Sequence, residues 1–168
     1  MATSANGIIA RNNNEEDFLS HTNWDTLVEL TTKTGCLIWG RKTYEIVKKW
    51  DKKYLDTLKN IVKVIISSDQ SFEVEEGFVK VNSPKKALEI LEKKGFTSAI
   101  LTGGSHNNTS FAKENLINEI ILNIEPVVIG MGILVFASDD FDLKLELLET
   151  KEINKNLLQL HYKVIKNV

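Results

Sequence analysis

The feature that most constrains this chain is an apolar strand pattern that runs into glycine and then into a helix pattern. Cys36-Leu37-Ile38-Trp39 reads as a buried strand, and Gly40-Arg41-Lys42-Thr43-Tyr44-Glu45 follows it directly. A strand that turns through glycine into a helix start presents backbone N–H groups and the positive end of the helix dipole. With Arg41 and Lys42 added, the turn suits a multiply charged phosphate. An ordinary strand–turn–helix with solvated cations is the alternative.

A second turn of the same kind lies further along the chain. The apolar stretch Ile100-Leu101 runs into Thr102-Gly103-Gly104-Ser105, and we expect a helix from about Ser110 to Asn115. Adjacent glycines allow backbone angles and close approaches that a Cβ atom forbids. Ligands of open α/β sheets bind at the carboxyl ends of the strands, where both turns fall. A flexible polar loop is the alternative for the residues after the glycines, but two such turns favour a ligand site.

Size and composition indicate one globular domain. The chain has 168 residues, 42% of them hydrophobic, and a net charge of −2 that gives no general attraction to nucleic acid or anionic membranes. No run approaches the ~18 apolar residues of a membrane span, and no basic-then-apolar leader begins the chain. The single cysteine, Cys36, excludes an internal disulfide and a cysteine-based metal site. We therefore expect no metal, no nucleic-acid or membrane partner, and a cytoplasmic protein.

Strand and helix patterns alternate through the first two thirds of the chain. Besides the strands that lead into the two turns, we expect strands at 61–66, 78–81 and 119–124, and helices at about 23–34, 42–49 and 84–94. After Pro126 a short strand is expected at 134–137, and residues 142–149 and 156–165 alternate as an antiparallel hairpin does. The prediction is a single α/β domain over residues 1–168, with a mostly parallel central sheet, flanking helices and antiparallel C-terminal edge strands.

Five segments in this order resemble the dihydrofolate reductase superfamily across nearly the whole chain. They are residues 3–10, 40–45, 64–68, 102–104 and 125–132. The similarity is greatest to the branch that includes the reductase domain of bacterial riboflavin biosynthesis, and it implies a dihydrofolate reductase-like fold. Gly130-Met131-Gly132, in the last segment, lacks the third glycine of a Rossmann fingerprint. Met1 almost directly precedes the first segment, so we expect either a short first strand or a start codon placed too late.

The resemblance implies NADPH as the hydride donor and assigns it to the two turns. Gly40, Arg41, Lys42 and Thr43 would hold the pyrophosphate and the 2′-phosphate, and Ser67 and Ser68 would line the adenosine end. Gly103 and Gly104 would pass close to the cofactor through a cis peptide, with Ser105 continuing the turn. Ile9 would pack beside the nicotinamide.

The substrate side departs from the family at one position. Folate reductases use a buried acid in the first helix to grip the pterin and assist its protonation, and the alignment puts Asn23 there. Asparagine hydrogen-bonds a heterocycle edge but is no general acid. Asp25 lies on the same helix, although residues two apart point to different faces, and a solvated first-turn role is its alternative. The remaining implied substrate contacts are Ser4, Asn6 and Phe18.

Three functions remain open from the sequence. The leading one is NADPH-dependent reduction of a pterin C=N bond, most directly dihydrofolate to tetrahydrofolate. The second is reduction of the phosphorylated ribosylamino-pyrimidine of riboflavin biosynthesis, which the missing acid at Asn23 favours. The third is a non-catalytic NADPH-binding protein. Relatives of the riboflavin type often form dimers, so a homodimer is carried as a further expectation.

Overall fold

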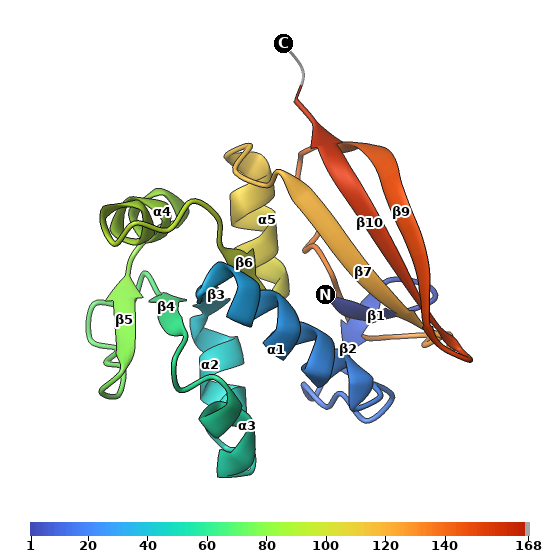
Figure 1. The fold of residues 1–168 in the computed structure, drawn as a ribbon, viewed down its shortest axis with the longest axis horizontal. Helices are drawn as coiled ribbons and strands as arrows, with labels where there is room; N and C mark the ends of the chain where they lie inside the picture. Colours follow the sequence, from blue (N-terminus) through green and yellow to red (C-terminus); the bar gives the residue numbers. More distant parts are fainter. Residues whose placement is uncertain (167–168) are drawn as a thin grey trace. The chain divides into compact units, whose positions relative to one another are not determined.

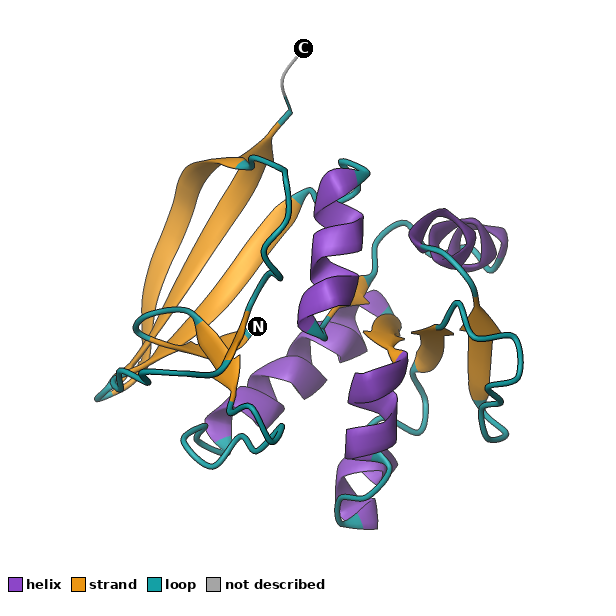
Figure 2. Cartoon of the chain, turned by 180° about the vertical axis from the view of Figure 1, so that it is seen from behind, coloured by secondary structure: helices purple, strands orange, loops and turns teal. Residues whose placement is uncertain are grey.

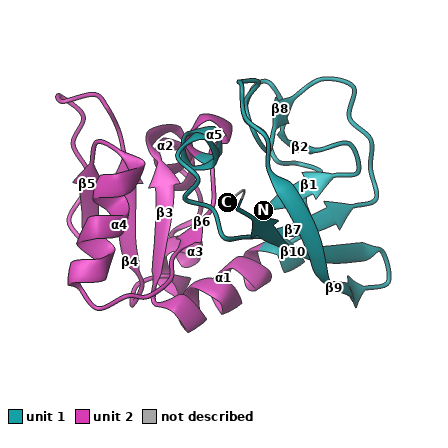
Figure 3. Cartoon of the chain, turned by 90° about the horizontal axis from the view of Figure 1, so that it is seen from above, with its two compact units in different colours: residues 1–23, 108–168 teal, residues 24–107 magenta. Residues whose placement is uncertain are grey.

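The structure is a computed structural model that describes residues 1–166, so residues 167 and 168 of the predicted domain lie outside the described residues. Figure 1 shows the fold, and Figure 3 shows the two compact units into which the chain divides. Unit 1 comprises residues 1–23 and 108–168, and unit 2 comprises residues 24–107. Unit 2 is therefore one continuous stretch of sequence. None of the helices in residues 1–166 combines the length and the apolar character that crossing a membrane requires.

Unit 2 contains a parallel sheet of four strands in the order β5-β4-β3-β6. Its strands are β3 (Cys36–Gly40), β4 (Val62–Ile66), β5 (Phe78–Val81) and β6 (Ile100–Leu101). The run from Cys36 to Trp39 is buried at every residue, as in a strand covered on both faces. The predicted parallel sheet is thus confirmed, and the two glycine turns follow neighbouring strands, β3 and β6.

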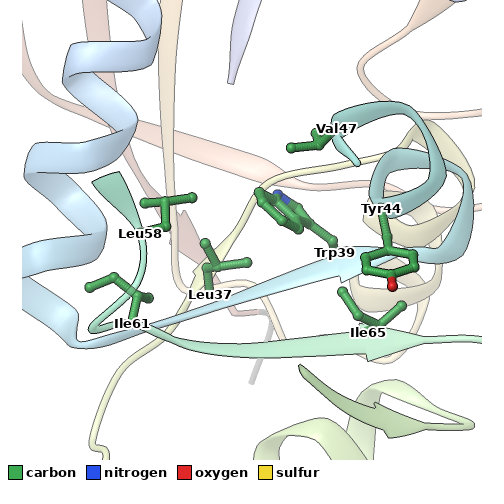
Figure 4. Packing of buried hydrophobic residues seen from close by; sticks show 7 residues of the cluster. All are labelled: Leu37, Trp39, Tyr44, Val47, Leu58, Ile61 and Ile65. Atoms are coloured by element: carbon green, nitrogen blue, oxygen red, sulfur yellow. The ribbon is translucent and has the colours of Figure 1, made fainter. Parts of the chain in front are cut away.

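The hydrophobic core of unit 2 forms around β3 and the helix α2 (Arg41–Val47). Figure 4 shows its seven central residues, which are Leu37, Trp39, Tyr44, Val47, Leu58, Ile61 and Ile65. Leu37 and Trp39 are two residues apart in β3 and therefore share a face of the sheet. Tyr44 packs edge-on against Phe72 and Phe78, with ring centroids 5.8 and 4.9 Å away. This packing fixes both sides of the β3–α2 turn.

The helices end and begin at residues that the sequence marks. Helix α1 (Thr22–Thr34) stops at Gly35, whose φ of +76° suits glycine. Helix α4 (Pro84–Lys93) starts after Ser83, whose hydroxyl oxygen accepts a bond from a first-turn N–H. Helix α3 (Lys52–Thr57) was not predicted. Asp51 caps it by accepting from the N–H of Lys53, in a lysine-rich stretch that reads as a solvated surface.

Unit 1 contains a four-stranded sheet in the order β1-β7-β10-β9 and a separate pair, β2-β8. Their bounds are β1 (Ala2–Ser4), β2 (Ile8–Ala10), β7 (Glu119–Glu125), β8 (Ile133–Leu134), β9 (Lys144–Asn154) and β10 (Leu157–Ile165). Strand β1 runs parallel to β7, whereas β10 is antiparallel to both β7 and β9. Figure 2 shows the three long strands side by side. The predicted C-terminal hairpin is confirmed.

Two element boundaries differ from the prediction. Helix α5 (Ser105–Lys113) begins at Ser105 rather than at Ser110, so the polar run after the glycines is helix and not loop. Its polar side chains find backbone acceptors, since Asn108 Nδ2 donates to the carbonyl of Val135 at 2.8 Å and Thr109 Oγ1 to that of Ala137 at 3.2 Å. Strand β8 covers Ile133–Leu134 instead of 134–137.

Gly132 is required by packing within unit 1. A Cβ atom on Gly132 would lie 2.6 Å from the carbonyl oxygen of Ala10 and 2.5 Å from Cγ2 of Ile8. A Cβ atom on Gly130 would meet nothing within 4 Å. The glycine pair in this segment therefore includes one position that excludes a side chain and one that tolerates it.

We expect Gly132→Ala to lower the free energy of unfolding by about 2 kcal/mol, because β2 has to move to admit the methyl group. Gly130→Ala is the matched control and should stay within about 0.5 kcal/mol of wild type. Urea unfolding followed by circular dichroism measures both values. Equal stabilities of the two variants would contradict the close packing of Gly132 on β2.

Candidate functional site

The first predicted turn lies in unit 2, where β3 ends and α2 begins. Gly40 precedes the helix and supplies no side-chain cap. Arg41 is partly exposed, with its Nη1 2.8 Å from Asp69 Oδ2 and its guanidinium 5.7 Å from the centroid of the Phe72 ring. Lys42 is exposed in the first turn of α2. The two predicted cations stand at the turn, and an acid and an aromatic ring hold Arg41 in place.

The second predicted turn follows β6 and has a distinct backbone. Gly103 has a φ of +92°, in the region that favours glycine, and the Gly103–Gly104 peptide is cis. This is the peptide conformation that the family resemblance implies. Ser105 is buried and begins α5. The second turn therefore joins a short strand directly to a helix.

The two turns contact each other. The N–H of Gly40 donates to the carbonyl of Gly103 at 2.9 Å, and Asn107 Nδ2 donates to the same oxygen at 3.1 Å. A Cβ atom on Gly40 would lie 3.2 Å from Asn107 Cβ, and one on Gly104 would lie 3.3 Å from Thr43 Oγ1. Side chains at these two glycines would crowd the junction. The side chain of Asn107 therefore donates to the backbone of the turn itself.

A cavity of about 380 Å³ lies beside the carboxyl end of β4. It is lined by Ser67, Ser68, Asp69, Gln70, Lys80, Val81, Asn82, Lys86 and Ile90. Lys80 Nζ donates to the carbonyl oxygens of Gln70 and Phe72, and Lys86 Nζ lies 2.8 Å from Glu89 Oε2. The two predicted serines thus line a cavity with two lysines, which the sequence analysis missed because single lysines on exposed faces carry no signal.

Ser4 and Asn6 of unit 1 build the turn that precedes Ile9. Ser4 Oγ accepts from the N–H of Ile8 at 2.9 Å and donates to Asn6 Oδ1 at 2.8 Å. Asn6 also exchanges two bonds with the backbone of Ile129, at 2.8 and 3.1 Å. Ile9 is buried, with 8% of its surface exposed. The side chains of Ser4 and Asn6 are thus hydrogen-bonded within unit 1 and hold the shape of this turn.

Asn23 is part of a polar cluster in unit 1. Its Nδ2 donates to Glu125 Oε1 at 2.7 Å, and its Oδ1 accepts from Asn123 Nδ2 at 2.9 Å. Asn123 Oδ1 in turn accepts from Gln159 Nε2 at 2.8 Å. Glu125 is the residue that the sequence analysis missed. It begins the segment 125–132 of the family resemblance, but nothing in that segment indicates that its side chain meets Asn23.

Asp25 and Phe18 lie in different settings. Asp25 is exposed in the first turn of α1, whereas Asn23 is half-buried, as the difference in helix face predicts. Phe18 is half-buried in the loop that follows β2. In the same loop the side chains of Arg11 and Asp17 form two hydrogen bonds, of 2.5 and 2.9 Å, and these bonds lower the pKa of Asp17.

Glu16 in this loop has a perturbed acidity. Its side chain is exposed, yet the surrounding chain withdraws enough water from the carboxyl group to raise its pKa from 4.5 to about 7. A raised pKa means that the folded protein binds more protons than the unfolded chain between these two values. The stability that protonated Glu16 contributes is therefore present below pH 4.5 and lost as the pH rises through about 7.

We expect Glu16→Gln to stabilise the protein at pH 8 and to leave its stability unchanged at pH 4. The gain at pH 8 should be about 1 kcal/mol, reduced from the full linkage value because solvent screens an exposed side chain. Thermal unfolding at the two pH values measures the difference, with the acidic pH as the internal control. A melting-temperature difference that is the same at both pH values would contradict the raised pKa.

The comparison with protein families decides between the superfamily branches. A family model described as the RibD C-terminal domain matches residues 1–159. The chain belongs to the RibD C-terminal domain family. This confirms the predicted resemblance. The uncharacterized protein YwjB of Bacillus subtilis is 27% identical over 165 residues, covering 96% of this chain and 94% of YwjB.

Solved structures agree with the family assignment. A putative riboflavin biosynthesis protein from Shewanella sp. PV-4 has 25% sequence identity and a TM-score of 0.81, covering 99% of this chain and 97% of the other. A dihydrofolate reductase from Enterococcus faecalis, complexed with NADP(H), has 15% identity and a TM-score of 0.73, covering 98% and 94%. This member of the RibD C-terminal domain family therefore has the predicted dihydrofolate reductase-like fold.

Proposed function

We propose that this chain is an NADPH-dependent reductase that transfers hydride to a C=N bond of a pterin, with dihydrofolate as the leading substrate. The observation that carries the proposal is the contact between the two glycine turns of unit 2, where the Gly40 N–H meets the Gly103 carbonyl at 2.9 Å. Family membership supports a reductase of this fold. NADPH oxidation with different heterocycles as substrates tests which one the protein reduces.

The residues of unit 2 suit a dinucleotide phosphate. Gly40 and Gly104 keep side chains away from the junction, so a pyrophosphate can approach the backbone. Arg41 and Lys42 supply positive charge at the same turn, and Thr43 and Ser105 supply hydroxyl groups. Ser67 and Ser68, with the nearby Lys80 and Lys86, line a cavity at which the adenosine end would bind, and Arg41 would hold its 2′-phosphate. NADPH, when bound, supplies the hydride, and these residues hold and orient it.

The residues of unit 1 suit a planar nitrogen heterocycle. Ser4 and Asn6 fix the turn before Ile9, the residue that we assign to the nicotinamide. Phe18 offers a ring for stacking. Asn23 can hydrogen-bond the heterocycle but cannot protonate it, because a carboxamide has no acidic proton to donate. We assign Asp25 no contact with the heterocycle, since its exposed position on α1 separates it from the Asn23 cluster.

The test is the loss of NADPH absorbance when the protein is incubated with a candidate substrate. Oxidation of NADPH with dihydrofolate supports the proposal. If NADPH is oxidised with the phosphorylated ribosylamino-pyrimidine but not with dihydrofolate, the protein is a reductase whose substrate is the pyrimidine. If NADPH binds tightly but neither compound is turned over, the protein is a non-catalytic nucleotide-binding module.

The predicted homodimer and cytoplasmic location belong to this proposal. Apolar side chains are exposed on the β9–β10 hairpin, namely Leu145, Leu147, Leu148, Leu158 and Ile165, and a second copy of the chain would cover such a surface. Light scattering coupled to size exclusion measures the mass in solution. A cytoplasmic reductase has access to NADPH, and the buried free thiol of Cys36 is compatible with a reducing compartment.

A further inference from the structure

The side chain of Glu125 is a buried carboxylate without an opposite charge. Glu125 ends β7 with 7% of its surface exposed. Two neutral donors bind it, the backbone N–H of Ser20 and Nδ2 of Asn23, each at 2.7 Å. No lysine, arginine or histidine within residues 1–166 forms an ion pair with it. A carboxylate buried without a cation is costly, so its presence points to a use.

One oxygen of this carboxylate remains available. Both donors bind Oε1, which leaves Oε2 without a donor from the described part of the chain. Within that part, Asn108 Oδ1 is the one side-chain polar atom that is both fully enclosed and without a partner. Oε2 is therefore not sealed inside the protein. It is an acceptor that a bound molecule can reach.

A chain of amides determines which way Asn23 faces. Gln159 donates to Asn123, Asn123 donates to Asn23, and Asn23 donates to Glu125, at 2.8, 2.9 and 2.7 Å. Because Oδ1 of Asn23 is the acceptor in this chain, its Nδ2 has to point at Glu125. The residue at the usual acid position thus holds a carboxylate from the neighbouring strand. Glu125 pairs with Ser4 in the β1–β7 register and so lies beside the turn that precedes Ile9.

We propose that Glu125 binds the N–H edge of the substrate heterocycle, in place of the acid that Asn23 lacks. This inference rests on the proposed function. An amino group of an aminopyrimidine presents N–H donors, and Oε2 of Glu125, which has no donor from the described part of the chain, accepts one of them. Pterins and aminopyrimidines share this edge. Glu125 is then a substrate-binding residue, and Ser20 and Asn23 are the residues that position it.

The experiment measures binding of 2,4-diaminopyrimidine to the full-length protein by calorimetry. Glu125→Gln keeps the shape of the side chain and removes its charge, so we expect the dissociation constant of this probe to rise about 10- to 100-fold. Glu119→Gln is the matched control, because it makes the same change at the exposed start of β7, and it should bind the probe within about twofold of wild type. NADPH should bind wild type and both variants equally.

A second variant, Glu125→Asp, provides a test in case Glu125→Gln does not fold. Glu125→Asp keeps the charge and withdraws it by one methylene group, so its affinity for the probe should fall between those of wild type and Glu125→Gln. If Glu125→Gln does not melt cooperatively, the affinity of the Glu125→Asp variant for the probe tests the inference. Wild-type affinity in the folded Gln or Asp variant, or no binding of the probe to wild type, overturns the inference. Absence of NADPH oxidation, with probe binding still dependent on Glu125, overturns the proposed function instead.

Discussion

Arg41→Ala should weaken NADPH binding about 10- to 100-fold while changing NADH binding by less than about threefold, because a charge-assisted hydrogen bond contributes ~1.5–3 kcal/mol and only NADPH has the 2′-phosphate. Arg41 is held ready by Asp69 at 2.8 Å. Hydrogen bonds from Ser71, together with the Arg41 charge, lower the pKa of Asp69 and keep this pair ionic at neutral pH. A planar guanidinium can bind the carboxylate and a phosphate at the same time. Quenching of protein fluorescence by each cofactor measures the two dissociation constants.

The control for this prediction is Arg11→Ala. Arg11 forms its own ion pair with Asp17 in unit 1, so this variant removes the same charge from another place. It should bind both cofactors as wild type does. The effect of Arg41→Ala should also shrink at high salt, because ions screen a partly exposed charge. If NADPH and NADH bind Arg41→Ala with unchanged affinities, the 2′-phosphate assignment is wrong.

Leu37→Ala should lower the free energy of unfolding by about 3 kcal/mol, the typical cost of a large-to-small change in a packed core. Leu37 lies in β3, is 0% exposed, and pairs with Lys63 of β4 and Ile100 of β6. A cavity here would also loosen the strand that leads into Gly40. For a chain of this size, the melting temperature should fall by roughly 6–12 °C. Thermal unfolding followed by circular dichroism measures the shift.

Leu134→Ala is the matched control for Leu37→Ala. Leu134 is 46% exposed on the short strand β8, so the same deletion removes less buried surface. Its melting temperature should stay within about 2 °C of wild type. Adding saturating NADPH should raise the melting temperature of the Leu37 variant if the β3–α2 turn keeps its shape. Equal destabilisation by the two substitutions would contradict the placement of Leu37 in the core.

The sequence predicted the parts of the fold that depend on local pattern. These parts are the apolar run from Cys36 to Trp39, the glycine that ends α1 and the start of α4 after Ser83. Each depends on only a few consecutive residues, so it can be recognised in the sequence. The position of both glycine turns at the carboxyl ends of strands was also predicted, because each apolar run leads directly into glycine. Helix α3 was missed since its two lysines and the adjacent Tyr54 and Leu55 do not form a helical stripe.

The polar clusters depend on strand register, which the sequence does not state. Glu125 meets Asn23 only because β7 runs beside β1 and places its last residue near the start of α1, over a separation of more than a hundred residues. The residues around Glu125 in the sequence do not indicate that Asn23 is its partner. Lys80 and Lys86 reach one cavity from a strand and a helix for the same reason. Charge composition alone cannot tell such groups from solvated surface.

The division of the chain has a consequence for its synthesis. Residues 24–107 leave the ribosome as one uninterrupted stretch, so the parallel sheet and both glycine turns can assemble while translation is under way. Strand β1 emerges earlier but waits for β7, which is translated about a hundred residues later and so, at ~5–20 residues per second, arrives several seconds afterwards. The polar cluster around Asn23 is completed only when the last strands have been made.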